Sequence, residues 1–253
     1  MKSILFSFLT IGVVSALAIG ASQAFFSDSE TSAENTFIAG SLNLKVGSTA
    51  SYNGSPVAAS TWDQKDLDRV SSEKFFNFTD LKPGDKGENT IVFSVDNSAW
   101  MCADLEITQN SNLGKYLNLV WWIDDGDNIY ESGEKALYGG PRTIDGWLAL
   151  VGTQAGGTGT LPLTLADSVS NWTTWPAATP NTLAIPADTP QHLGVGWCFG
   201  NLVLDESQPY GFSCDGTEDQ NDAQGSSIIG NLSFSVIQSR NNADYLCPEH
   251  TAL

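Results

Sequence analysis

The chain has 253 residues and a formal net charge of −18 at pH 7, because 29 acidic residues oppose 11 basic ones. A surface this acidic repels nucleic acid and anionic lipid, so we expect no nucleic-acid partner. The length suits one large β-domain, and we expect a single domain over residues 25–253.

The N-terminal segment is typical of a secretion signal. Lys2 precedes an uncharged apolar run over residues 4–19, and Ser22 and Ala24 are the small residues that a signal peptidase requires. The run is short for a membrane span. We therefore expect residues 1–24 to be removed by cleavage between Ala24 and Phe25. The mature protein would then be secreted to the cell surface or extracellular matrix, with no stable membrane span.

Short segments with alternating or β-branched apolar residues recur between glycines and prolines, which favours an all-β, jelly-roll-like β-sandwich. The expected strands are Leu42–Val46, Thr90–Val95, Asp104–Thr108, Asn118–Ile123, Leu161–Leu165 and Asn231–Gln238. Helical periodicity is weak, and Ser60–Val70 is the best candidate for a short helix or an exposed loop. Turn residues are denser over about 124–224, which predicts a long loop-rich insertion between the N- and C-terminal strands.

The four cysteines predict two disulfides, because an even count in an exported chain favours cross-links. Three pairings are possible. Cys198 and Cys214 bracket a loop rich in Gly, Pro, Asp and Ser, so we pair these two and leave Cys102 with Cys247. A metal site is less favoured, since neither a C-x-x-C spacing nor a nearby histidine pair supports it.

An acidic segment after residue 123 resembles a calcium-binding loop of the EF-hand type, in which oxygen ligands alternate along the chain. In that register the ligands of a Ca²⁺ ion would be Asp125, Asp127, the carbonyl of Ile129, Glu131 and Glu134. The first ligand position falls on Ile123, and Asp124 is the substitute there if the loop shifts locally. Asn128 takes the usual glycine position and tolerates a positive φ. The alternative is a β-hairpin tip with solvated carboxylates.

The sequence predicts no enzyme. It has no HExxH motif, and its two histidines, His192 and His250, are expected to be exposed residues without a catalytic role. Eight tryptophans raise a sugar-binding alternative, with Trp172 and Trp175 as the candidates in a polar loop. Tryptophan also fills wide sandwich cores.

Two blocks near the N-terminus carry a family resemblance. The first runs Ala24-Phe25-Phe26-Ser27-Asp28 and continues as Asn35-x-Phe37-x-Ala39-Gly40-Ser41-Leu42-Asn43-Leu44; the second is Phe78–Asp85, with the sequence FTDLKPGD. These blocks resemble the TasA/camelysin family of secreted fibre-forming proteins, although Ser27 is one residue more than the family pattern has. Beyond Cys102 the resemblance is diffuse.

The resemblance implies a secreted structural subunit of a biofilm-matrix filament, processed by a dedicated signal peptidase. The mature N-terminus supports this independently, because an exposed aromatic, β-capable tail needs a surface to cover it. We expect residues 25–40 to be a donor strand, anchored by Phe25, Phe26 and Phe37, that pairs with the next subunit in an open homo-oligomeric filament. The alternative is a monomeric calcium-dependent surface adhesin or carbohydrate-binding module. A camelysin-like metallopeptidase is disfavoured.

Overall fold

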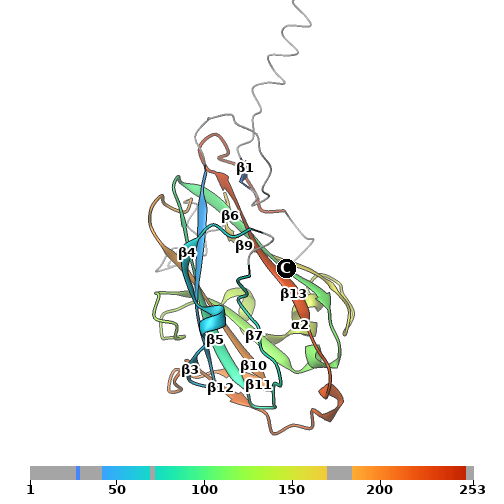
Figure 1. Ribbon diagram of the computed structural model, residues 1–253. Helices are drawn as coiled ribbons and strands as arrows, with labels where there is room; N and C mark the ends of the chain where they lie inside the picture. The colour runs from blue at the N-terminus through green and yellow to red at the C-terminus, as the bar shows by residue number, and fades with distance from the viewer. Residues whose placement is uncertain (1–26, 29–41, 69–71, 170–183, 249–253) are drawn as a thin grey trace, which may run out of the picture.

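The computed structural model describes residues 27–28, 42–68, 72–169 and 184–248 (Figure 1). Two antiparallel sheets pack face to face, which confirms the expected all-β sandwich; the jelly-roll connectivity stays a prediction. The four-stranded sheet has the order β1 (Ser27–Asp28), β13 (Ile229–Gln238), β6 (Ala99–Gln109) and β9 (Gly159–Ala166).

The second sheet has seven strands. Its order is β3 (Ser55–Pro56), β2 (Leu44–Tyr52), β5 (Lys86–Val95), β10 (Gln191–Phe199), β7 (Leu117–Asp124) and β8 (Arg142–Thr143), and β4 (Trp62–Lys65) also pairs with β2. A separate hairpin consists of β11 (Asn201–Leu204) and β12 (Phe212–Asp215). Within the described residues, the helical elements are α2 (Ile144–Ala149) and the 3₁₀ turns Ala58–Ser60, Asn112–Lys115, Leu137–Gly139 and Asn221–Ala223.

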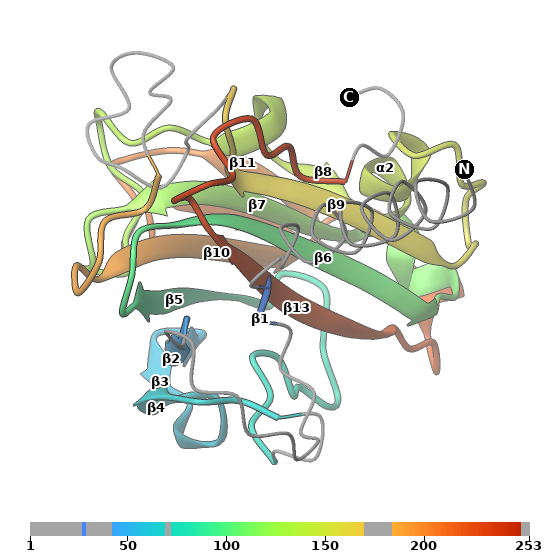
Figure 2. The ribbon, with the colours of Figure 1, turned by 90° about the horizontal axis from the view of Figure 1, so that it is seen from above.

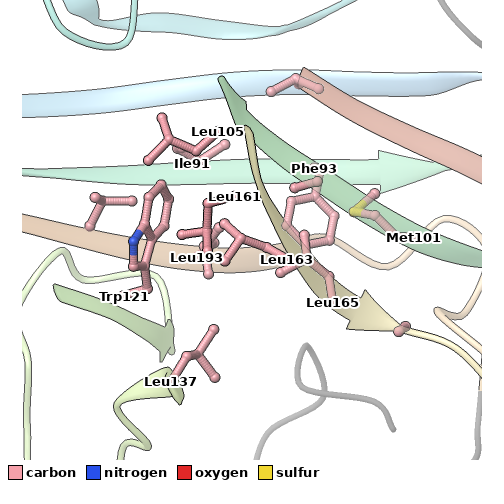
Figure 3. Close-up of a cluster of buried hydrophobic side chains, with 14 of the residues drawn as sticks. Ile91, Phe93, Met101, Leu105, Trp121, Leu137, Leu161, Leu163, Leu165 and Leu193 are labelled. Atoms are coloured by element: carbon pink, nitrogen blue, oxygen red, sulfur yellow. The ribbon is translucent and has the colours of Figure 1, made fainter. Parts of the chain in front are cut away.

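The main core lies between the two sheets. Alternate residues of β5, β6 and β9 point inward, as the period of two along a strand requires. Figure 3 shows buried members of this core: Ile91, Phe93, Met101, Leu105, Trp121, Leu137, Leu161, Leu163, Leu165 and Leu193. Burial of each such side chain contributes about 2 kcal/mol, so this layer accounts for the choice of strand register.

A second apolar layer covers the outer face of the seven-stranded sheet. It consists of Val120, Trp122, Cys198, Leu202, Tyr210 and Phe212. Because β7 and β10 are covered on both faces, their sequences are nearly continuous apolar runs rather than alternating ones.

The six expected strands all exist, although several extend beyond their predicted ends. Two other expectations were wrong. Ser60–Val70 contains β4 rather than a helix or an open loop. The segment 124–224 is not an insertion, since it contributes β9 and the central strand β10. β10 was not predicted because it contains glycines, which are typical of loops. A Cβ at Gly194 would lie 2.0 Å from Cε2 of Trp122, so this strand position has no room for a side chain.

Both predicted disulfides are present. Cys102–Cys247 joins β6 to the C-terminal segment, and Cys198–Cys214 joins β10 to β12. Among the described residues, no helix is long and apolar enough to cross a membrane.

Candidate functional site

The first candidate site is the edge of the four-stranded sheet where β1 lies. Figure 2 shows β1 beside β13, and the pairing is antiparallel, with Ser27 opposite Ile237 and Asp28 opposite Val236. Val236 and Ile237 are 3% and 7% exposed. Residues 27 and 28 therefore pair with a buried part of the last strand.

This pairing occupies two of the ten residues of β13. Across the described ranges, the outer edge over 229–235 has no strand partner. Ile229 is 54% exposed, while Phe234 is half-buried and packs near Phe75 and Phe93, with ring centroids 6.0 and 6.3 Å apart. An edge of this kind presents free backbone groups to an added strand. The expected anchors Phe25, Phe26 and Phe37 and the Ala24–Phe25 bond lie outside the described residues.

The second candidate site is the acidic loop, residues 124–134, on the outer face of the seven-stranded sheet. Three carboxylates, from Asp124, Asp125 and Asp127, each place an oxygen within 4.8 Å of the other two. We call these three residues the acidic cluster. Asp124 is the last residue of β7 and is 2% exposed, whereas the other two are exposed.

Local hydrogen bonds fix the path of the acidic loop. The carboxylate of Glu134 accepts from the backbone N–H of Asp125 at 3.0 Å and from that of Glu131 at 2.8 Å. Asp127 Oδ1 accepts from Ile129 N at 2.9 Å. Glu134, predicted as a ligand, thus closes the loop through backbone contacts. Ligand roles for Glu131, Glu134 and the Ile129 carbonyl stay predictions.

The sheet beneath also holds the loop. The Thr90 hydroxyl, on β5, lies 2.6 Å from Asp124 Oδ2 and 2.7 Å from Asn128 Oδ1. Asn128 has a φ of 68°, the left-handed conformation expected at its position. Thr90 was not predicted as a site residue, because only the register of β5, β10 and β7 brings it to the loop.

Burial raises the pKa values of acids around this site. It raises the pKa of Asp124 above its ordinary value, against the opposing Thr90 hydrogen bond. It raises the pKa of Glu134 to about 7, against its hydrogen bonds with the backbone of Glu131 and Asp125. Burial, with the negative charges of Asp124 and Asp127, also raises the pKa of Glu88 to about 8, although the Ser51 hydrogen bond opposes this. Several acidic side chains therefore lie in one low-dielectric region, which disfavours their charged forms.

Histidine and tryptophan expectations have mixed outcomes. His192 lies on β10 opposite Asp124, not in a loop, and it is half-buried; His250 lies outside the described residues. The sugar-binding candidates Trp172 and Trp175 also lie outside them. The described tryptophans pack in or against the interior: Trp100, Trp121, Trp122, Trp147 and Trp197 are buried, and Trp62 is half-buried.

Among the described residues, the group of side chains close enough together to hold a metal ion contains aspartates alone. Oxygen-only ligands suit calcium or magnesium, whereas hydrolytic zinc sites use histidine. Comparison with protein families and curated proteins assigns no function to this site. The chain matches no protein-family model and no curated protein at a significant level.

Proposed function

We propose that this protein is a secreted structural subunit that assembles into an extracellular filament by donating its N-terminal strand to a neighbouring copy. The observation that carries the proposal is the β1–β13 ladder. A strand that pairs with β13 of its own chain can make the same ladder with β13 of a second copy, because the two surfaces are identical.

The segment between β1 and β2 is long enough for β1 to pair with a second copy of the protein. Residues 29–41 connect β1 to the rest of the chain, and thirteen extended residues reach at most about 45 Å. One-way donation from each copy to the next does not close and gives an open filament, whereas reciprocal exchange between two copies gives a closed dimer.

The receiving edge favours occupation by a strand longer than β1. Over 229–235, β13 pairs with β6 on its inner side, and its outer edge has no strand partner in the part of the chain that the structure describes. Added strands gain affinity from backbone hydrogen bonds and specificity from alternate side chains. Two disulfides support an oxidising, extracellular destination, and the resemblance to TasA/camelysin proteins supports a matrix role.

Electron microscopy of the signal-cleaved protein tests the proposal. We expect filaments from the chain that begins at Phe25 and monomers from a chain that lacks residues 25–32. A synthetic peptide of residues 25–32 should bind the truncated protein, and a scrambled peptide of the same composition should not. Filaments in equal yield from the truncated protein would contradict strand donation. A monomeric mature protein that binds glycan would support the adhesin alternative instead.

A further inference from the structure

The acidic cluster contains an oxygen with no partner. Asp124 is 2% exposed, its Oδ2 contacts Thr90, and its Oδ1 has no hydrogen-bond partner among the described residues. A buried carboxylate oxygen left unsatisfied is costly. One carboxylate oxygen from each of Asp124, Asp125 and Asp127 lies within 4.8 Å of the other two, so a single cation between them would contact all three.

We propose that Asp124, Asp125 and Asp127 bind one Ca²⁺ ion on the outer face of the seven-stranded sheet. This inference is separate from filament assembly, since the cluster lies on the sheet opposite the one that carries β1 and β13. It also revises the ligand register expected from the sequence, by placing the buried Asp124 at the centre of the site.

The surrounding contacts hold the ligands in place. Glu134 fixes the backbone on both sides of the turn, and Thr90 fixes Asp124 and Asn128. A Cβ at Gly126 would lie 3.1 Å from Cε1 of His192, so the turn lies close against β10. Metal ligands that are supported in this way lose little freedom when the ion binds.

A second buried acid on the same sheet strengthens the case. Glu88 is 4% exposed, and its Oε2 also has no hydrogen-bond partner in the described part of the chain. The negative charge of Asp124 and Asp127 acts on Glu88, and the positive charge of Lys86 opposes it. A bound divalent ion neutralises the negative charge.

Calcium suits the cluster better than magnesium or zinc. The ligands are carboxylates on a turn with two exposed members, and calcium accepts irregular oxygen sites completed by water. Magnesium requires a tighter octahedral arrangement, and zinc prefers nitrogen and sulfur. With three protein carboxylates, we expect an affinity of about 10⁻⁴ to 10⁻³ M, as in extracellular modules.

The test uses the signal-cleaved chain after treatment with a chelator. Terbium, which replaces calcium at oxygen sites, should luminesce when the protein is excited at its tryptophans, and Ca²⁺ should displace it at one site per chain. Asp127→Asn should weaken Ca²⁺ binding at least about tenfold, the effect of losing roughly 1.4 kcal/mol. Asp124→Asn should weaken it at least as much.

Asp145→Asn is the matched control. Asp145 is another buried carboxylate with an unpartnered oxygen, but it belongs to no acidic group of this kind among the described residues. Its variant should bind Ca²⁺ like the wild type. The proposal is overturned if binding does not saturate below about 10 mM, if Mg²⁺ displaces terbium as well as Ca²⁺ does, or if Asp127→Asn binds normally. If Asp124→Asn fails to fold, Ca²⁺ binding by the Asp127→Asn variant still decides the outcome, because Asp127 is exposed. Binding is measured per chain, so the result does not depend on whether filaments form.

Discussion

Ser27 lies opposite Ile237 in the antiparallel ladder between β1 and β13. The beginning of the expected mature chain thus completes a sheet at the last strand of the fold. The same ladder between two copies would join the N-terminus of one to the C-terminal strand of the next.

The two disulfides should contribute unequally to stability. Cys102–Cys247 closes a loop with a sequence separation of 145, and Cys198–Cys214 closes one of 16. In the loop-entropy account the longer loop contributes about 5 kcal/mol and the shorter about 3 kcal/mol. Urea unfolding of the two double Cys→Ser variants checks this order; a larger loss from the Cys198/Cys214 pair would contradict it.

Burial of Glu88 should make stability depend on pH. Its pKa rises from an ordinary 4.5 to about 8 in the folded protein, so the folded chain holds a proton that the unfolded chain has released. Stability from this group is present below pH 4.5 and is lost as pH rises through about 8. The slope is at most about 1.4 kcal/mol per pH unit.

Glu88→Gln should flatten this dependence, because the amide stays neutral. Unfolding in denaturant between about pH 5 and 9, with a chelator present, measures the slope for both proteins. Identical slopes would show that Glu88 ionises in the fold at no cost.

Because Trp122 packs closely on Gly194, replacing this glycine should destabilise the fold. A Cβ at Gly194 would lie 2.0 Å from Cε2 of Trp122, whose side chain is fully buried. We expect Gly194→Ala to destabilise the protein by about 3 kcal/mol. Trp122→Leu should relieve part of this loss in the double variant, since the two changes act on one contact. Additive losses in thermal unfolding would contradict the steric account.

Thr90→Val should loosen the acidic loop. The substitution keeps the shape of the side chain but removes the hydroxyl that contacts Asp124 and Asn128. We expect a loss of about 1–3 kcal/mol and weaker calcium binding. Thr49→Val is the matched control, because Thr49 lies opposite Thr90 on β2 and is exposed. Equal behaviour of the two variants would exclude a role for Thr90 in the loop.

The sequence predicted the features that depend on local pattern. Alternation located β13, where Val236 is buried and Ser233 is exposed. Cysteine spacing and loop composition predicted both disulfides. The acidic loop was recognised because its carboxylates are close in the chain.

Features that depend on register across the sheet could not be predicted. Thr90 contacts the acidic loop, and Glu88 lies within electrostatic range of it, only because of the register of β5, β10 and β7. β10 was missed because Gly194 and Gly196 are typical of loops, and their need for rings packed above them appears only in the fold. The first ligand position was uncertain for a related reason, since the burial of Asp124 depends on neighbouring strands.

Cysteine cross-linking at β1 and β13 tests strand donation most directly. All four native cysteines are in disulfides, so a Ser27→Cys/Ile237→Cys variant adds the reactive pair, and each single variant serves as control. The signal-cleaved double variant would be assembled under mild reduction, oxidised, and examined on a non-reducing gel. Strand donation predicts a ladder of covalently joined subunits from the double variant and nothing larger than dimers from the singles. Filaments whose subunits all run as internally cross-linked monomers would show that β1 stays on its own chain, and would contradict the account.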